Sequence, residues 1–252
     1  MNRWRWAAAS KIGTAHIKLG TRKQDTLYCF LAKSDPPIAC AIVSDGAGSA
    51  RFGGEGAAIV CRTLSVSIRE YFRQTDSMPD EPAFWSWVDN IRDRLSFAAK
   101  KRDVSRQAFA STLIVLIASE ASCVVAHIGD GAVVARDKSG SWKTLSRPEN
   151  GEYASTTYFV TQDPHPKMRL SLHEDSFDAF AVFTDGIECI ALDAQTSDPF
   201  VGFFNPMLSP LDRSAAFGND RTLSQKLGEY LLSAGICERT DDDKSLILIS
   251  SA

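Results

Sequence analysis

The sequence lacks any apolar run that approaches the roughly 20 residues needed for a membrane-spanning helix. Its basic start, residues 1–13, lacks the apolar core and the cleavage site of a secretory signal. It also lacks a CxxC pair, and most of its six cysteines stand inside apolar runs. This pattern indicates buried thiols in a reducing compartment rather than a disulfide framework or a zinc site. We therefore expect a cytoplasmic protein that does not insert into a membrane.

An excess of charge of one sign is missing as well. The 28 Lys and Arg residues oppose 31 Asp and Glu residues, and the net charge of −3 gives no electrostatic reason to expect nucleic acid as a partner. The histidines, His16, His127, His165 and His173, are isolated, so no Cys/His spacing indicates zinc. The 252 residues show no internal repeat and can bury a sizeable core. We expect a single domain over residues 1–252.

The apolar pattern predicts many strands and few helices. Runs of β-like composition predict strands over 26–32, 38–44, 109–118, 122–129, 131–137, 141–146, 155–161, 168–174, 177–185 and 245–251. Apolar residues spaced three and four apart predict helices over 54–74, 82–102 and 221–235. Residues 188–220 are predicted to form a long irregular connection, whose apolar cluster can serve either the core or a flap over a site. The pattern favours an α+β fold, with a central β-sandwich of two antiparallel sheets flanked by helices in four layers, α-β-β-α.

Acidic or amide side chains stand at five strand edges. Asp45, Asp130 and Asp185 each precede a glycine beside an apolar strand, residues 241–243 precede the last strand, and residues 24–25 precede an early one. A single Asp-Gly is more often a turn, because Asp can hydrogen-bond its own backbone and Gly accepts a positive φ. Five such edges together are harder to explain as turns. Carboxylates that meet at one rim repel one another unless cations neutralise them, and Mg²⁺ and Mn²⁺ take oxygen ligands.

The order of these motifs resembles a known family. The segments are QD (24–25), SDGAGSARFGGEGA (44–57), ASTLIVLIA (110–118), HIGDGAVVARD (127–137), FTDGIE (183–188) and DDKSLILI (242–249). Together they resemble the metal-dependent serine/threonine phosphatases of the protein phosphatase 2C-like class, in a divergent bacterial branch. The resemblance covers residues 13–249. It implies a β-sandwich flanked by helices, with a binuclear Mn²⁺ or Mg²⁺ centre at one end.

The resemblance also implies roles for the residues that carry chemistry. Asp45 is expected to bridge two metal ions, and the carbonyl of Gly46 to face one of them, since glycine lets the backbone approach closely. Asp185 and Asp242 are expected to complete the first metal site. With Asp45 they are the residues on which we expect catalysis to depend.

Three further residues are implied as metal-associated. Gln24 stands where the family often has glutamate, and Asp25 follows it. Both are expected to act through metal-bound water. Asp130, together with Asp185, corresponds to a more labile third metal site. Asp243 occupies a place that is commonly asparagine.

Two positions depart from the family pattern. Ala47 stands where eukaryotic members have a histidine that is proposed as general acid, and Gly20 stands where many members have an arginine that binds phosphate. Arg22, Lys23 or Arg51 could replace that arginine, although such residues are more often solvated surface charges. We expect these departures to affect substrate orientation and leaving-group protonation more than metal binding.

Two hypotheses of function remain open. In the first, two metal ions hold a bridging hydroxide in line with phosphorus and hydrolyse phosphoserine and phosphothreonine in a phosphorylated protein substrate, opposing a serine/threonine kinase. In the second, the same fold serves as a non-catalytic regulatory module that binds a phosphoprotein or a kinase. The presence of Asp45, Asp185 and Asp242 favours the enzyme.

Overall fold

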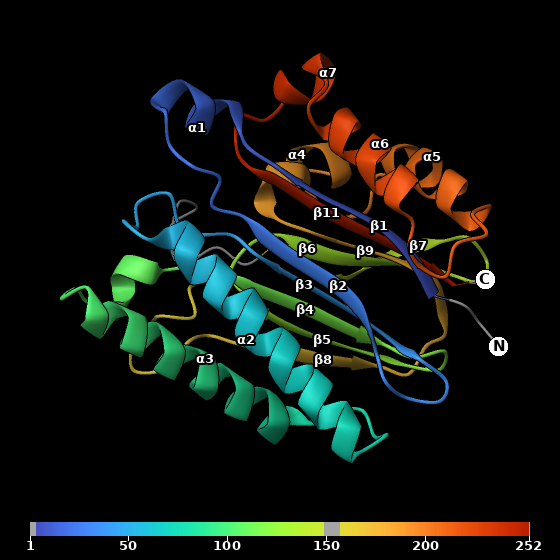
Figure 1. Ribbon diagram of the computed structural model, residues 1–252. Helices are drawn as coiled ribbons and strands as arrows, with labels where there is room; N and C mark the ends of the chain where they lie inside the picture. Colours follow the sequence, from blue (N-terminus) through green and yellow to red (C-terminus); the bar gives the residue numbers. More distant parts are fainter. Residues whose placement is uncertain (1–3, 149–156, 252) are drawn as a thin grey trace.

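Two β-sheets stacked face to face form the centre of the computed structural model, which describes residues 4–148 and 157–251 (Figure 1). The six-stranded sheet has, in spatial order, β10 (Gly218–Asn219), β1 (Trp4–Lys11), β11 (Lys244–Ser251), β9 (Phe177–Phe183), β6 (Ala132–Asp137) and β7 (Trp142–Ser146). The five-stranded sheet has β2 (Thr26–Ala32), β3 (Ile38–Ser44), β4 (Leu113–Ala118), β5 (Cys123–Ile128) and β8 (Arg169–His173). Neighbouring strands are antiparallel except β1 and the short β10.

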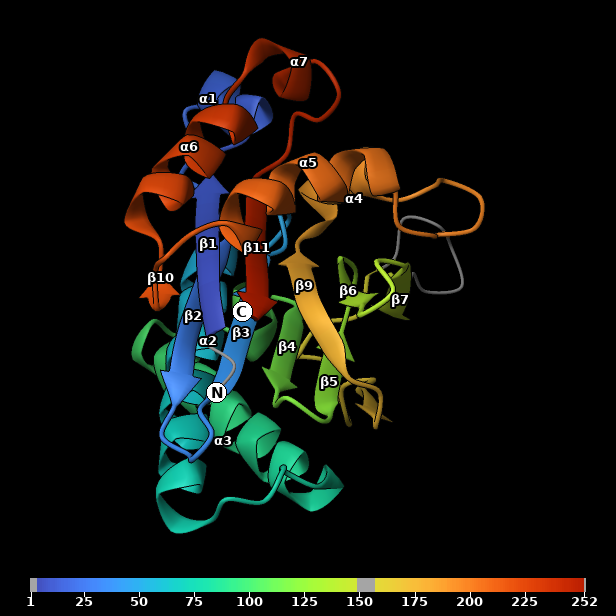
Figure 2. The ribbon, with the colours of Figure 1, turned by 90° about the vertical axis from the view of Figure 1, so that its right-hand side faces the viewer.

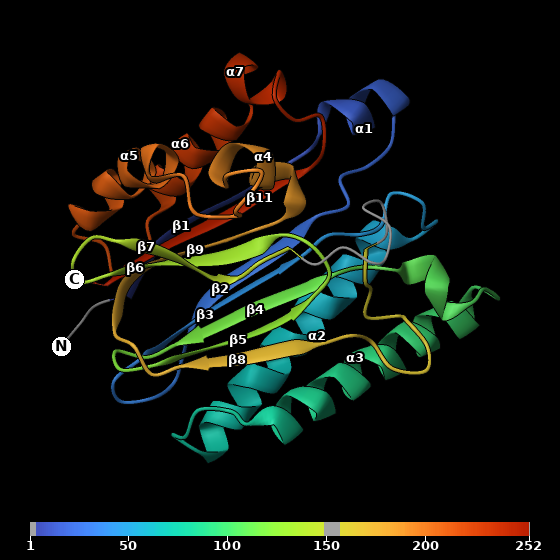
Figure 3. The same ribbon diagram turned by 180° about the vertical axis from the view of Figure 1, so that it is seen from behind.

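Helices cover the outer face of each sheet (Figures 1 and 3). Two long helices, α2 (Gly53–Gln74) and α3 (Glu81–Lys101), lie against the five-stranded sheet. The other sheet carries α5 (Val201–Asp212) and α6 (Arg221–Leu231). Short helical segments complete the fold: α1 (Thr14–Leu19), α4 (Glu188–Ala191), α7 (Ala234–Cys237) and the 3₁₀ turns η1 (Arg106–Phe109) and η2 (Asp185–Ile187). The predicted α-β-β-α sandwich is therefore confirmed.

Strand alternation explains the three cores. Successive side chains of a strand point to opposite faces of its sheet. In β3, Cys40 and Ile42 pack toward the helices α2 and α3, whereas Ala39, Ala41 and Val43 pack between the sheets. A third core lies between the six-stranded sheet and α5 and α6. The central strands are thus apolar on both faces, which is why they read as continuous apolar runs in the sequence.

Three sequence predictions about elements are wrong. Residues 4–11, read only as a basic start, form strand β1, which pairs with β11 along its whole length. The described residues 157–161 contain no strand, and residues 155–156 of the same predicted strand lie outside the described residues. Residues 188–220 are not irregular, because they contain α4, α5 and β10.

The sandwich has two distinct ends. Both chain termini lie at one end, which faces the viewer in Figure 2, and α1 and the beginning of α2 lie at the other (Figures 1 and 3). Strand β3 runs toward the second end and strand β11 starts from it, so the residues that follow β3 and precede β11 meet there. No helix in the described ranges has both the length and the apolar character needed to cross a membrane.

Candidate metal centre

Asp45 stands directly after β3 and is fixed by the neighbouring strand. Its backbone N–H donates to Thr112 Oγ1 at 2.9 Å, and the Thr112 N–H donates back to the Asp45 carbonyl at 2.8 Å. The Ser44 hydroxyl donates to the Thr112 carbonyl at 2.6 Å. The β-ladder therefore extends past the end of the strand and holds the carboxylate at the rim of the core.

Gly46 allows the loop after Asp45 to lie against the start of α2. A Cβ atom on Gly46 would sit 2.2 Å from the backbone carbon of Gly53, and one on Gly53 would sit 2.7 Å from the Ala47 carbonyl oxygen. Gly46 also forms an isolated β-bridge with Ser111. The glycine after Asp45 is thus required by the close contact of two backbone segments.

Asp45, Asp130 and Asp185 converge at this end of the sandwich. Each offers one carboxylate oxygen, and these three atoms lie within 4.8 Å of one another. Asp130 is presented by the turn between β5 and β6, where Gly129 and Gly131 have φ values of 109° and 87° that favour glycine. Asp185 begins η2, just after β9. Three strand ends of both sheets therefore bring three acids to one point.

The local field opposes the ionisation of these carboxyls. Burial, followed by the charges of Asp25 and Asp185, raises the pKa of Asp45 well above its ordinary value. Burial, followed by the charges of Asp130 and Asp242, raises the pKa of Asp185 to about 8. Burial also raises the pKa of Asp130, although the Thr157 hydroxyl donates to its Oδ2 at 2.6 Å. Raised pKa values of this kind arise where acids gather without a compensating cation.

Asp25 and Gln24 point unsatisfied oxygens into the same region. The side chain of Asp25 is 3% exposed; its Oδ2 accepts from the Thr184 hydroxyl at 2.8 Å, whereas its Oδ1 is buried without a hydrogen-bond partner. Burial raises the pKa of Asp25 to about 6, and its carboxyl interacts with that of Asp45. The Oε1 atom of Gln24 is likewise buried and unpartnered. Buried acceptors without a hydrogen-bond partner are uncommon in proteins, so these two oxygens are candidates to bind an ion or a water molecule.

Asp242 and Asp243, which precede β11, have different roles. Asp242 is not one of the three converging acids, although its charge contributes to the raised pKa of both Asp45 and Asp185. Asp243 is buried, and its carboxylate accepts from the backbone N–H groups of Gly13 (2.7 Å), Gln24 and Asp25 (3.3 Å). Asp243 therefore connects the segment before β2 to the segment before β11.

His16, one of the isolated histidines of the sequence, lies on the short helix α1. Its Nδ1 atom lies 3.1 Å from Asp243 Oδ1. The side chain therefore touches the connecting carboxylate rather than the three converging acids.

Glu188 is a carboxylate at this site that sequence reasoning missed. It begins α4, and its Oε1 accepts from the Gly131 N–H, next to Asp130. Burial raises the pKa of Glu188 to about 7. The signal was present in the segment FTDGIE, because residues three apart in a helical turn share a face and Glu188 follows Asp185 by three.

The structure shows the surroundings of Ala47 and of the three basic residues that could replace the missing arginine. Ala47 is buried, and its N–H donates to the Ala110 carbonyl at 2.9 Å. The Lys23 ammonium is engaged by the Asp25 carbonyl and by Ser10 Oγ. Arg22 and Arg51 line a cavity of about 640 Å³ beside Gln24. The Arg51 guanidinium lies 5.1 Å from the centre of the Phe52 ring, and within the described ranges neither arginine forms an ion pair with an acid. Both can therefore meet an anion next to the acidic cluster.

The donor set fits a hard divalent cation. Within the described ranges, none of Asp45, Asp130 and Asp185 forms an ion pair with a basic side chain. The atoms on offer are carboxylate and amide oxygens, with buried unpaired ones at Asp25 and Gln24. Mg²⁺ and Mn²⁺ prefer this ligand chemistry.

Comparison with known proteins gives a consistent result. A family model described as protein phosphatase 2C matches residues 12–232. The chain is 32% identical, over 248 residues, to serine/threonine-protein phosphatase 3 of Escherichia coli (strain K12), with 97% of each chain covered. Its fold is similar to a bacterial serine phosphatase (TM-score 0.66, 12% identity, 97% and 96% of the chains covered). It is also similar to the catalytic domain of the serine threonine protein phosphatase PstP in complex with two manganese ions (TM-score 0.66, 12% identity, all of both chains covered).

Proposed function

The chain belongs to the protein phosphatase 2C family, and we propose from this premise that it hydrolyses phosphoserine and phosphothreonine in proteins at the acidic cluster of Asp45, Asp130 and Asp185. Phosphatases of this family depend on metal ions, so the chain is a metal-dependent hydrolase. We locate the site at these acids because one carboxylate oxygen of each lies within 4.8 Å of the other two, and none of the three has a basic partner in the described ranges. The presence of Asp45, Asp185 and Asp242 in the sequence also disfavours a non-catalytic binding module.

We infer the cation ligands from these three acids together with Asp242 and Gly46, which the family resemblance adds. Asp45, Asp185 and Asp242, with the carbonyl of Gly46, would hold a pair of Mn²⁺ or Mg²⁺ ions, and Asp130 with Asp185 would hold a third. Such ions activate water and neutralise charge on the phosphoryl oxygens. The unpaired oxygens of Gln24 and Asp25 support binding through water.

The chain's own groups orient the reaction rather than attack phosphorus. Ser111 is fully buried, and the Thr112 hydroxyl accepts from the Asp45 N–H, so neither is a free nucleophile. The Thr184 hydroxyl holds Asp25 by donating to it, and itself accepts from the Ser245 N–H at 3.1 Å. Arg22 and Arg51 line the adjacent cavity, which supports our proposal that they bind the substrate phosphate.

The biological setting follows from the chemistry of the substrate. A protein phosphatase acts on a phosphorylated protein and opposes the kinase that made the phosphoester. All six cysteines are free thiols, which supports a reducing, cytoplasmic location. We treat residues 1–252 as a single catalytic domain.

The test is phosphate release from a phosphothreonyl peptide and from p-nitrophenyl phosphate, with Mn²⁺ and with EDTA. Asp45→Asn and Asp185→Asn are expected to lower kcat/KM by on the order of a hundredfold, since loss of a ligand weakens cation binding. Asp89→Asn, an exposed residue on α3, is the matched control and should keep the wild-type rate. Wild-type turnover in both Asn variants would overturn the location of the site.

A further inference from the structure

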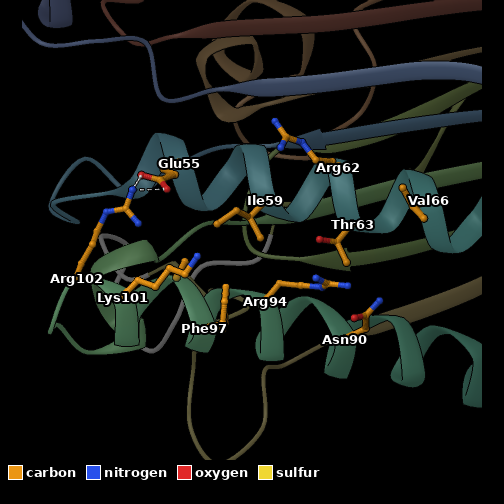
Figure 4. A pocket seen from close by; sticks show the side chains of 11 residues that line it. Glu55, Ile59, Arg62, Thr63, Val66, Asn90, Arg94, Phe97, Lys101 and Arg102 are labelled. Atoms are coloured by element: carbon orange, nitrogen blue, oxygen red, sulfur yellow. Dashed lines mark hydrogen bonds and ion pairs between the residues drawn. The ribbon is translucent and has the colours of Figure 1, made fainter.

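A second hollow lies on the outer surface, between α2 and α3 (Figure 4). It has a volume of about 590 Å³. Its lining residues recur along each helix at spacings of four, three, one and three, which places them on one face of α2 and on one face of α3. We call this hollow the helix groove.

The helix groove is rich in positive charge, although the whole chain is acidic. Arg62, Arg94, Lys101 and Arg102 line it, against a single lining acid, Glu55. Glu55 is already neutralised, because both of its oxygens accept from Arg102 at 2.7 Å. The net charge of the chain is −3, so the groove is a positively charged region on an acidic protein.

Three of these cations, Arg62, Arg94 and Lys101, form no ion pair within the described ranges, and two of them belong to α3. Within the described ranges, Arg94 forms no ion pair, and the Lys101 ammonium lies 4.5 Å from the centre of the Phe97 ring rather than near a carboxylate. Both extend from α3 toward the space between the helices (Figure 4). They are therefore available to an anionic partner.

The groove also presents apolar surface to solvent. Phe97 is 59% exposed and Val66 is 52% exposed, and Ile59 lies between the helices. Exposed apolar side chains gathered with unpaired cations match a ligand that carries both carboxylates and an apolar side chain. An acidic peptide has this chemistry. A nucleic acid offers phosphates without aliphatic side chains, and a flat bilayer does not fill a groove between two helices.

The groove is continuous with the catalytic end of the molecule. Glu55 lines both the helix groove and the cavity that holds Gln24, Arg22 and Arg51. From Glu55 to Val66 the helix rises about 16 Å at 1.5 Å per residue. An extended chain of about five residues covers that length.

We propose that the helix groove docks an acidic segment of the phosphoprotein substrate, with one apolar side chain against Phe97 and Val66. This proposal rests on the proposed function, because the docked segment belongs to the substrate whose phosphorylated residue lies at the acidic cluster. The segment begins at the phosphorylated residue and passes Glu55. Its carboxylates then meet Arg94 and Lys101.

The test compares phosphothreonyl peptides that differ only in a flanking segment. One peptide carries the segment Glu-Asp-Leu-Glu-Asp and the other carries Gln-Asn-Leu-Gln-Asn. Each peptide is made in two forms, with the segment before or after the phosphorylated residue. For one of the two placements of the segment, the kcat/KM of the wild-type protein is expected to be about fivefold higher for the acidic peptide than for the neutral one. This ratio should decrease at high salt. In the variant Arg94→Ala/Lys101→Ala this ratio should fall to about one. In the control Arg73→Ala/Lys100→Ala, which removes two exposed cations outside the groove, it should not change.

A second measurement keeps the two proposals separate. Fluorescence anisotropy of the labelled, unphosphorylated acidic peptide reports docking without turnover, and binding should be lost in Arg94→Ala/Lys101→Ala. Equal turnover of both peptides by the wild type would overturn the docking proposal alone. Absence of any Mn²⁺-dependent phosphate release, with p-nitrophenyl phosphate included, would overturn the proposed function. Binding of phosphatidylserine vesicles or of single-stranded DNA in place of the peptide would also overturn the docking proposal.

Discussion

Asp243 illustrates how one residue type takes opposite roles at the same end of the sandwich. Its buried carboxylate accepts from the backbone N–H groups of Gly13, Gln24 and Asp25, whereas Asp45 faces other acids. The sequence shows a run of three aspartates before the last strand. It does not show which member faces the backbone, because that depends on where the chain before β2 passes.

We therefore predict a large loss of stability in Asp243→Ala. Three backbone donors would lose their acceptor in a buried place, and the free energy of unfolding should fall by about 3 kcal/mol. Asp243→Asn keeps one acceptor oxygen and should lose less. Urea denaturation in EDTA measures both, so that the effect is separated from metal binding. An alanine variant as stable as the wild type would contradict the bridging role.

Gly46 gives the second prediction at this scale. In Gly46→Ala the new methyl group would meet the backbone of Gly53 at 2.2 Å, and backbone cannot move aside as a side chain can. We expect the loop after Asp45 to shift, with loss of Mn²⁺-dependent turnover by at least about tenfold, since small misplacements of reacting groups are costly. Gly48→Ala lies in the same loop, and its methyl would find its nearest neighbour at 4.0 Å. This control should retain most of the activity.

At the scale of elements, predictability follows the strength of local patterns. The helices over 54–74 and 82–102 are found as α2 and α3 within one residue at each end, because a long apolar stripe is a local signal. Helix α5 was missed because Pro206 and Pro210 lie inside it. Strand β1 was missed because its pairing with β11 joins the two ends of the chain, which no local pattern reports.

Helix α5 is tied to the sheet by aromatic packing, which is the basis of a third prediction. Phe204 is fully buried, stacks on Trp142 at a centroid distance of 4.8 Å and lies 6.0 Å from Phe183. Phe204→Ala should lower the free energy of unfolding by about 3–5 kcal/mol. Phe200→Ala, at a position that is 57% exposed, should change it by about 0.5 kcal/mol or less. Urea denaturation of the two variants side by side tests whether this segment belongs to the core.

At the scale of the whole molecule, the sandwich gathers acids that lie far apart in the sequence. Asp45, Asp130 and Asp185 follow strands of both sheets, and only the stacking of the sheets brings them within 4.8 Å. The sequence predicts that each acid stands at a strand end, since an apolar run before Asp-Gly is visible. No local pattern predicts which acids meet, so that expectation comes from the family resemblance alone. Asp242 lies outside the converging three, and Glu188 was missed although it lies beside Asp130.

Folding therefore concentrates negative charge, and this makes the stability of the metal-free protein depend on pH. Burial and neighbouring charges raise the pKa of Asp185 to about 8 and that of Glu188 to about 7, whereas in the unfolded chain both ionise near pH 4. Between these limits the folded state binds more protons than the unfolded state. The free energy of unfolding consequently falls as pH rises toward 8. His127 acts in the opposite sense at lower pH, because burial lowers its pKa to about 3.

Because His127 is neutral in both states above about pH 7, it does not oppose the carboxyls between pH 7 and 8.5. The buried thiols of Cys29, Cys40, Cys61 and Cys123, whose pKa burial raises, act in the same sense as the carboxyls near pH 8.5, so the Asp185→Asn variant is needed to separate the two contributions. In EDTA we expect the melting temperature to fall across this window, and we expect Mn²⁺ to raise it most at pH 8.5, where cations replace the released protons. The variant Asp185→Asn cannot ionise at that position, so in EDTA its melting temperature should depend less on pH. Scanning calorimetry of both proteins at both pH values measures the effect. A wild type that becomes more stable at pH 8.5 in EDTA would show that the acids do not repel one another as the fold places them.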